Sequence, residues 1–277
     1  MNYYEYVFTD ISNEKKEILI ALLSINGFDG FEESDADLKA FTALEIGDDE
    51  LHNIIKLTGV SYSKSEIKEI NWNAEWESSF EPVTVPYPDS DKIFANIRAH
   101  FHPAVSSATH EVIITPKMSF GTGHHATTFG MIESMISIDF KDKEVIDFGT
   151  GTGVLAILAE KMGARHINAI DNDEWSISNA AENIKVNRCS HIDLIRAESL
   201  EGILKADIIL ANINLNVIVS NLDVLVKACK KDTVILFSGM LSADKTFISA
   251  ELYKHSINIS NIYERNNWIV ILCDMKY

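Results

Sequence analysis

Apolar positions in the second half of the chain alternate between short continuous runs and longer stretches with helical spacing. The short runs have the length of buried strands, and the longer stretches have the length of helices. The predicted strands span 145–148, 166–170, 192–196, 207–211 and 233–238. The predicted helices span 154–162, 174–187, 217–230 and 243–255. This alternation predicts an α/β fold with a doubly wound parallel sheet, which binds ligands at the carboxyl ends of its strands.

The last part of the chain breaks the alternation. Two apolar runs, 257–263 and 268–274, flank the polar sequence E-R-N-N. Neighbouring strands around a short polar turn predict an antiparallel hairpin. The six-stranded dinucleotide-binding sheet does not end in this way, so the hairpin favours a different member of the doubly wound class.

The first 70 residues have another pattern and predict a separate, small α+β domain. Strands are expected at 3–9, 30–33, 39–44 and 60–70, and helices at 12–26 and 49–57. This β-α-β-β-α-β order is typical of ferredoxin-like folds. Because no catalytic constellation is evident there, we interpret residues 1–70 as a substrate-recognition domain, with a purely structural cap as the alternative.

Residues 71–88 predict a linker between this domain and a larger one at 89–277. Three aromatic residues recur at every fourth position and would share one helical face: Trp72, Trp76 and Phe80. Prolines follow at positions 82, 86 and 88, where they end a helix and favour an extended connection. The larger domain would then begin with strands at 93–101 and 111–115.

The formal net charge of the 277 residues is −17. Extensive nucleic-acid binding requires a basic face, so this charge disfavours that function. Residues 1–72 contain 15 acidic residues and six lysines, which places much of the acidic excess in the predicted recognition domain. An acidic surface suits a basic protein partner, although net charge also serves solubility alone.

The sequence also bears on location. The longest apolar run in the N-terminal region, 18–25, is too short to span a bilayer, and the first residues show no basic segment of a secretory signal. The cysteines at 189, 229 and 273 are far apart and show no metal or redox spacing. We therefore expect a cytoplasmic monomer with reduced thiols and no membrane contact.

Candidate chemistry is concentrated at V-I-D-F-G-T-G-T-G, residues 145–153, where a predicted strand turns into a helix. Gly149, Gly151 and Gly153 permit a tight turn and the close approach of a ligand to the backbone. The spacing Gly151-x-Gly153-x-x-Ala156 also fits a looser dinucleotide motif, so nicotinamide and flavin ligands remain open. Asp147, in front of the glycines, would attract a ligand's ammonium group and repel a pyrophosphate.

Two further polar residues end neighbouring strands. Asp171 follows the glycines by about 20 residues, the distance at which an acidic side chain binds ribose hydroxyls in nucleotide folds. That position suits both NAD and S-adenosylmethionine. Asn212 ends the fourth strand of this region, and its amide could accept a hydrogen bond from an amine.

A second unusual segment, F-G-T-G-H-H-A-T-T at 120–128, lies ahead of the glycine motif and precedes a helix expected at 129–138. Its dense glycines and hydroxyls predict a second wall of the same pocket. The adjacent His124 and His125 do not have the i, i+4 spacing of a helical zinc site, so we predict no metal.

Together, D-F-G-T-G-T-G, I-D-N-D and A-N-I-N resemble the motifs of class I S-adenosylmethionine-dependent methyltransferases. The 120–128 segment, the aromatic linker and the small N-terminal domain make the whole chain similar to the bacterial ribosomal protein L-eleven methyltransferase family. The resemblance implies a Rossmann-like methyltransferase sheet. It also implies methyl transfer from S-adenosyl-L-methionine to lysine ε-amines and the α-amine of the basic ribosomal protein L-eleven.

The resemblance assigns cofactor contacts to Thr128, Gly149, Asp171 and Asn212. Asn212 is also the expected catalytic residue, because it would orient the amine. To these contacts we add a wider set from the same two motifs and the third strand: Asp147, Gly151, Phe120, Thr122 and Ser199, the last beside Glu198. The sequence departs from many amino-group methyltransferases, because N-I-N replaces their N-P-P-Y and no aromatic residue follows Asn212. We expect Phe120 to supply that aromatic wall.

Three alternatives remain at this point. The chain could methylate another protein amine, an amide or a small molecule. It could be a nicotinamide-dependent oxidoreductase, against which Asp147 and the terminal hairpin argue. It could also be a binding protein without activity, against which the intact glycines, Asp171 and Asn212 argue.

Overall fold

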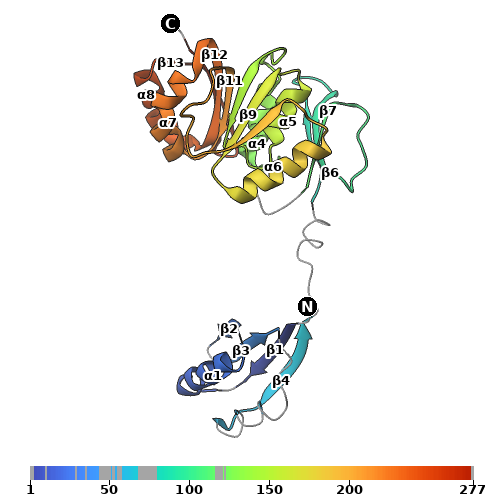
Figure 1. Ribbon diagram of the computed structural model, residues 1–277, viewed down its shortest axis with the longest axis vertical. Helices are drawn as coiled ribbons and strands as arrows, with labels where there is room; N and C mark the ends of the chain where they lie inside the picture. The colour runs from blue at the N-terminus through green and yellow to red at the C-terminus, as the bar shows by residue number, and fades with distance from the viewer. Residues whose placement is uncertain are drawn as a thin grey trace. The chain divides into compact units, whose positions relative to one another are not determined.

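The computed structural model describes residues 3–9, 11–28, 30–34, 36–43, 51, 54, 58–67, 80–115, 121 and 123–275. The chain separates into two compact units, Met1–Ser78 and Ser79–Tyr277, and each is described by itself. In Figure 1 the first unit runs from blue to cyan and the second from teal to red.

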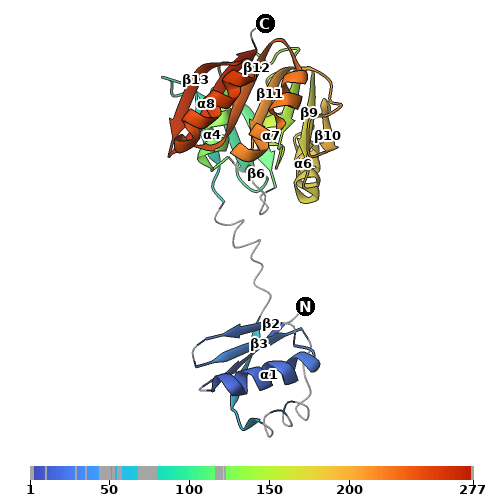
Figure 2. The ribbon, with the colours of Figure 1, turned by 90° about the vertical axis from the view of Figure 1, so that its left-hand side faces the viewer.

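The smaller unit is built on a four-stranded antiparallel sheet with the order β2-β3-β1-β4. Its described elements are β1 (Tyr3–Phe8), α1 (Asn13–Ile25), β2 (Gly30–Glu33), β3 (Leu38–Thr42) and β4 (Tyr62–Ile67). Leu19 and Leu23 of α1 share one buried core with Phe8 and Leu38 of the sheet, and Figure 2 shows α1 crossing the sheet. The strands agree with the sequence pattern. The helix expected at 49–57 lies mostly outside the described residues, so the ferredoxin-like assignment stays a prediction.

The larger unit contains a seven-stranded sheet with the order β10-β9-β8-β11-β12-β14-β13. Its strands are β8 (Glu144–Phe148), β9 (His166–Asp171), β10 (Ile192–Arg196), β11 (Ala206–Asn212), β12 (Cys229–Leu241), β13 (Ile257–Arg265) and β14 (Trp268–Met275). The first five are parallel, and β13 and β14 form the predicted antiparallel hairpin. Strand order runs outward in both directions from the β8–β11 pair. This pair is therefore the switch point at which doubly wound sheets bind ligands.

Helices cover both faces of this sheet (Figures 1 and 2). They are α4 (Ala126–Met135), α5 (Val154–Lys161), α6 (Glu174–Val186), α7 (Leu215–Lys227) and α8 (Lys245–Lys254), the last preceded by the short η1 turn (Ser242–Asp244). Residues of α4 and α5 share a core with Val145, whereas residues of α7 and α8 share one with Ile146. Adjacent residues of β8 thus point to opposite faces, as the period-2 geometry of a strand requires. The predicted Rossmann-like architecture is confirmed.

A separate three-stranded sheet, with the order β5-β6-β7, precedes the large one. It consists of β5 (Val83–Pro86), β6 (Ile93–Ala99) and β7 (Ala108–Ile114). β6 and β7 are parallel, and their apolar residues join the core that contains α4 and α5. β5 falls in the segment predicted as an extended connection, and it is in fact a paired strand, with Val83 opposite Ile97.

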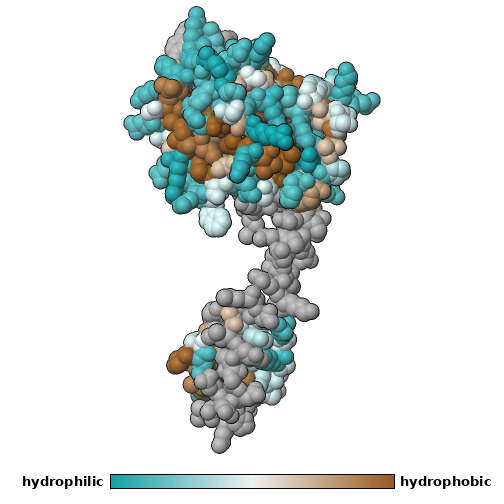
Figure 3. All heavy atoms as spheres, turned by 45° about the vertical axis from the view of Figure 1, so that its right-hand side comes forward, coloured by the Kyte–Doolittle hydropathy of each residue, from teal (hydrophilic) through white to brown (hydrophobic). Residues whose placement is uncertain are grey.

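The surface of the larger unit is mixed. Figure 3 shows hydrophobic residues grouped among hydrophilic ones on one of its faces. Single large apolar side chains are also exposed, and Trp175 at the start of α6 is 80% exposed. Isolated exposures of this kind are common on folded proteins. Within the described parts of the chain, no helix is long and apolar enough to cross a membrane.

Candidate functional site

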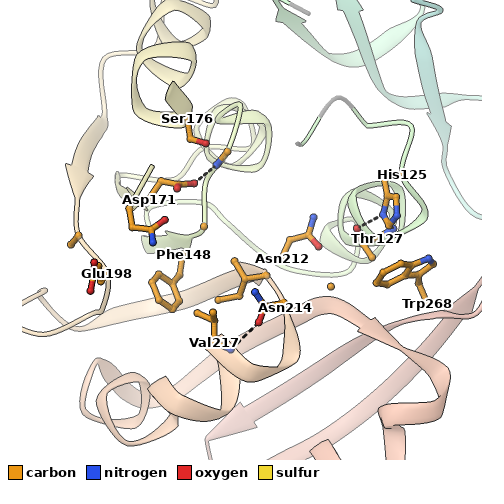
Figure 4. A pocket seen from close by; sticks show the side chains of 16 residues that line it. His125, Thr127, Phe148, Asp171, Ser176, Glu198, Asn212, Asn214, Val217 and Trp268 are labelled. Atoms are coloured by element: carbon orange, nitrogen blue, oxygen red, sulfur yellow. Dashed lines mark hydrogen bonds between the residues drawn. The ribbon is translucent and has the colours of Figure 1, made fainter. Parts of the chain in front are cut away.

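A cavity of about 470 Å³ lies at the carboxyl ends of β8, β9 and β11, next to the switch point. Residues from both sequence motifs and from all three of these strand ends line it (Figure 4). They are His125, Thr127, Phe148, Gly149, Gly151, Asp171, Asn172, Ser176, Ala197, Glu198, Asn212, Ile213, Asn214, Val217, Gly239 and Trp268. The cavity therefore has the place in the fold that the sequence pattern predicts.

The glycine motif forms a tight turn between β8 and α5. Gly149 has φ 78° and Gly151 has φ 55°, conformations that side chains with a Cβ adopt rarely. A Cβ atom at Gly149 would lie 2.0 Å from Cγ2 of Ile213, which follows β11. The glycine thus lets the β8 and β11 ends approach each other, and the backbone of the turn stays open to the cavity.

Asp171 connects the end of β9 to the glycine turn. Its Oδ2 accepts the Gly151 N–H at 2.9 Å, and its Oδ1 accepts the Asp173 N–H at 3.1 Å. The carboxylate also lines the cavity. It can accept hydrogen bonds from a ligand while it holds the turn, because each carboxylate oxygen has more than one acceptor site.

Asp147 lies beneath the glycine turn and is not among the residues that line the cavity. Its Oδ2 accepts the Thr150 hydroxyl at 2.7 Å and the Ala156 N–H at 3.2 Å, and its Oδ1 has no partner in the described part of the chain. Burial raises the pKa of this carboxyl to about 7, although the two hydrogen bonds oppose the rise and Asp171 adds to it. Strand alternation explains the placement: Phe148 faces the cavity, so its neighbour Asp147 points the other way.

Asn212 occupies the middle of the site, at the end of β11 (Figure 4). Its Nδ2 donates to the Thr128 hydroxyl oxygen at 3.2 Å. Its Oδ1 is buried and has no partner in the described residues, although the side chain lines the cavity. A buried acceptor without a partner is costly, so this oxygen is suited to a ligand that brings a donor.

The segment before α4 forms the opposite wall, as its composition predicts. His125 caps α4: its Nδ1 lies 2.8 Å from the Thr127 hydroxyl and accepts the Thr127 N–H at 3.4 Å. The His125 ring packs edge-on against Trp268, with 4.7 Å between ring centroids. Thr152 of the glycine turn donates its hydroxyl to the Gly121 carbonyl at 2.7 Å, so the two motifs are in direct contact.

The structure brings four of the predicted side chains or glycines to the cavity: Gly149, Gly151, Asp171 and Asn212. Thr128 does not line the cavity, but its hydroxyl oxygen accepts a hydrogen bond from the Asn212 side chain, which does. Ser199 is not among the lining residues, although its neighbour Glu198 is, and its hydroxyl accepts the Glu201 N–H at 3.3 Å. Phe120 and Thr122 lie outside the described residues.

Sequence reasoning missed Trp268 as a site residue. It is the first residue of β14 and pairs with Leu241 at the end of β12. Because β14 runs antiparallel to β12, its first residue lies at the same edge as the carboxyl ends of the parallel strands. The predicted hairpin contained this information, since the strand that returns from the turn must begin at the ligand-binding edge.

Among the described residues, no group of three or more histidine, cysteine, aspartate or glutamate side chains could hold a metal ion. The polar groups that line the cavity include the carboxylates of Asp171 and Glu198, the amide of Asn212 and the glycine backbone, all of which can hydrogen-bond to an organic ligand.

Comparison with known proteins gives consistent results. The family model described as ribosomal protein L11 methyltransferase (PrmA) matches residues 6–276. A curated ribosomal protein L11 methyltransferase from Bacteroides thetaiotaomicron is 34% identical, covering 98% of this chain and 99% of its own. Its counterpart from Chlorobaculum tepidum is 37% identical over 99% of this chain and 97% of its own. The crystal structure of a ribosomal protein L11 methylase from Lactobacillus delbrueckii subsp. bulgaricus matches with a TM-score of 0.62 and 26% identity, covering 68% of this chain and 97% of that one.

Proposed function

The chain belongs to the ribosomal protein L11 methyltransferase family, and on that premise we propose that it transfers methyl groups from S-adenosylmethionine to amines of ribosomal protein L11. The observation that carries the proposal is the buried Oδ1 of Asn212, which has no hydrogen-bond partner among the described residues and belongs to a side chain that lines the cavity with Gly149 and Trp268. An acceptor in that place suits a neutral amine, whose N–H it can bind while the nitrogen lone pair points toward the methyl group.

The cavity residues fit S-adenosylmethionine. The Asp171 carboxylate can accept hydrogen bonds from ribose hydroxyls, and the Gly149 and Gly151 backbone can approach the methionine part closely. Glu198, with Ser199 behind it, would border the adenine. We keep Thr128 as a support of Asn212, through the hydrogen bond between their side chains. A contact from Asp147 to the methionine ammonium also stays a prediction. Asp147 does not line the cavity, and its Oδ1, which has no partner among the described residues, is the atom that could make this contact.

When bound, the sulfonium of S-adenosylmethionine supplies an activated methyl group together with its leaving group. The protein's task is then to align the nucleophile, which orientation alone can accelerate strongly. A lysine amine with an ordinary pKa of about 10.4 must lose its proton before it can attack. Trp268 and the His125 ring present apolar surface beside Asn212, and such surface favours the neutral amine. No dedicated strong base is required in this account.

The smaller unit is proposed to recognise the protein substrate. Residues 1–72 carry 15 acidic residues and six lysines, a balance that complements a basic ribosomal protein. In this account residues 1–70 bind the substrate, residues 71–88 link the two domains, and residues 89–277 form the catalytic domain. We propose that the protein acts as a monomer in the cytoplasm. A shortened chain that begins at residue 73 should still bind S-adenosylmethionine but lose activity on the ribosomal protein. Full activity of the shortened chain would reject the recognition role.

The direct test is mass spectrometry of purified ribosomal protein L11 after incubation with this protein and S-adenosylmethionine. We expect mass increases in methyl steps, located on lysine side chains and the N-terminal amine. Cofactor binding without any modified L11 would point to a different acceptor. Thermal stabilisation by NAD but not by S-adenosylmethionine would instead favour the oxidoreductase alternative.

A further inference from the structure

Asn183 lies in the last turn of α6, fully buried, and uses its carboxamide to join two separate backbone segments. Its Oδ1 accepts the N–H of Thr115, the residue that follows β7, at 2.7 Å. Its Nδ2 donates to the carbonyl of Thr152 in the glycine turn at 2.8 Å. A carboxamide suits this position because it offers an acceptor and a donor at once.

Thr152 extends this connection to a third segment. Its hydroxyl donates to the carbonyl of Gly121 at 2.7 Å. A Cβ atom at Gly121 would lie only 2.7 Å from the same hydroxyl oxygen, and Gly121 has φ 106°. The close approach therefore requires a glycine at this position. Three hydrogen bonds thus run in series from Thr115 through Asn183 and Thr152 to Gly121.

The packing of α6 against the turn supports the same connection. A Cβ atom at Gly153 would lie 3.3 Å from the Cβ of Ala180, which precedes Asn183 by one helical turn. The face of α6 that carries Ala180 and Asn183 is therefore in direct contact with the glycine turn. The hydrogen bond from Asn183 to Thr152 forms within a packed interface, where losing it would leave a buried carbonyl without a donor.

We propose that Asn183 is a positioning residue that holds the glycine turn in register with the wall that carries His125. Gly121, at the end of the series, precedes His125 by four residues, and His125 lines the cavity. The other end, at Thr152, directly follows Gly151, whose N–H binds Asp171. Asn183 binds the glycine turn directly and the wall that carries His125 only through Thr152, and it does not line the cavity itself. The inference rests on the proposed S-adenosylmethionine site, because cofactor affinity is what the alignment of the turn would control.

Asn187, the C-cap residue of α6, provides a control one turn beyond Asn183. Its Oδ1 accepts the Ile113 N–H at 2.9 Å, and its Nδ2 donates to the Ile113 carbonyl at 2.5 Å. Asn187 thus binds the end of β7, two residues before the Thr115 N–H that Asn183 binds, and it uses both groups of its carboxamide there. Its side chain also donates to the backbone carbonyl of Asn183, and none of its hydrogen bonds reaches the glycine turn within the described residues. Both substitutions should lower the melting temperature, but only one should change the cofactor site.

The test compares full-length wild type, Asn183→Ala and Asn187→Ala by calorimetric titration with S-adenosylmethionine, with melting temperatures measured in parallel. We expect Asn183→Ala to raise the Kd about tenfold, because it removes one buried hydrogen bond that aligns the turn. Asn187→Ala should stay within about twofold of wild type. If the alanine variant does not fold, Asn183→Asp replaces it in the same titration. It keeps the shape and the acceptor for Thr115, but its ionised carboxylate cannot donate to Thr152, so the same loss of affinity is expected.

The inference would be overturned if the Asn183 variants and Asn187→Ala had the same Kd for S-adenosylmethionine, whether that Kd equals the wild-type value or is raised in all of them. A wild type that does not bind S-adenosylmethionine would instead contradict the proposed cofactor. The wild-type titration thus separates failure of the proposed function from failure of this role for Asn183.

Discussion

The two walls of the cavity differ in how their polar groups are satisfied. On the glycine-turn side, Asp171 holds the Gly151 N–H and Thr152 holds the Gly121 carbonyl, so internal hydrogen bonds set the shape of the wall. On the opposite side, Asn212 presents a buried oxygen without a partner in the described chain, beside the edge-on rings of His125 and Trp268.

This difference indicates a division of labour. A wall held together by its own bonds is preorganised and suits a cofactor that binds in the same way at each turnover. A wall with an acceptor that lacks a partner, bordered by the rings of His125 and Trp268, suits the amine of a substrate side chain, which must bind, lose a proton and be released at each turnover. The predictions below separate the two walls, beginning with the substitution expected to reduce activity most.

Removing the open acceptor should have the largest effect. Asn212→Ala takes away the group proposed to orient the amine, so kcat at saturating cofactor should fall about 100-fold, the scale seen for single preorganised groups in active sites. Asn221→Ala is the matched control, since Asn221 is also an asparagine 8% exposed but lies in α7 and does not line the cavity. Methyl-transfer assays on ribosomal protein L11 measure both. A normal kcat for Asn212→Ala would remove this residue from the active site.

An intermediate effect is expected on the glycine-turn side. Asp171→Ala removes both the predicted ribose acceptor and the bond to the Gly151 N–H, so the Kd of S-adenosylmethionine should rise about tenfold. Asp173→Ala is the control: Asp173 caps α6 by accepting the Ser176 N–H, so its loss should lower the stability of the protein without changing cofactor affinity. Unchanged affinity of the Asp171 variant, measured by calorimetry, would refute the ribose assignment.

The smallest change in activity is expected at Asp147, which underlies the glycine wall. Its pKa rises from 3.8 to about 7 on folding, so between these values the folded protein keeps a proton that the unfolded chain loses. Stability should therefore fall as pH rises through this window, by about 1.4 kcal/mol per pH unit. Asp147→Asn should remove this contribution. Its stability advantage over wild type, measured by urea unfolding, should grow from pH 5 to pH 7. An advantage that does not change with pH would contradict the raised pKa.

Much of the larger unit could be predicted from the sequence, because period-2 and helical patterns are strong where elements are long and buried. The five parallel strands and the terminal hairpin were found in this way, and the 120–128 motif was correctly expected beside the glycine turn. Helix boundaries were less accurate. α4 begins at Ala126 instead of 129 because His125 supplies the cap, and α7 ends at Lys227 instead of 230 because β12 already starts at Cys229.

The remaining differences arise from side-chain direction and from long-range pairing, which local patterns do not encode. Asp147 was predicted as a ligand contact from its position next to the glycines. Strand alternation directs its side chain away from the cavity, so that contact stays a prediction. β5 lies in the segment predicted as an extended connection, and its pairing with β6 was not predicted. Trp268 reaches the site only because its hairpin returns along β12. Each of these depends on which strand lies beside which.

The central claim is that the two walls serve different ligands, and Trp268→Ala tests it most directly. Trp268 lines the acceptor wall and contacts His125, so its loss should disturb the amine and leave the glycine turn intact. The measurement is calorimetric titration of this variant with S-adenosylmethionine, with Trp175→Ala, which is exposed and outside the cavity, as the control. The account predicts a Kd within about twofold of wild type, combined with at least a tenfold lower kcat/KM for ribosomal protein L11. A Kd weakened tenfold, with kcat/KM for L11 unchanged at saturating cofactor, would contradict it.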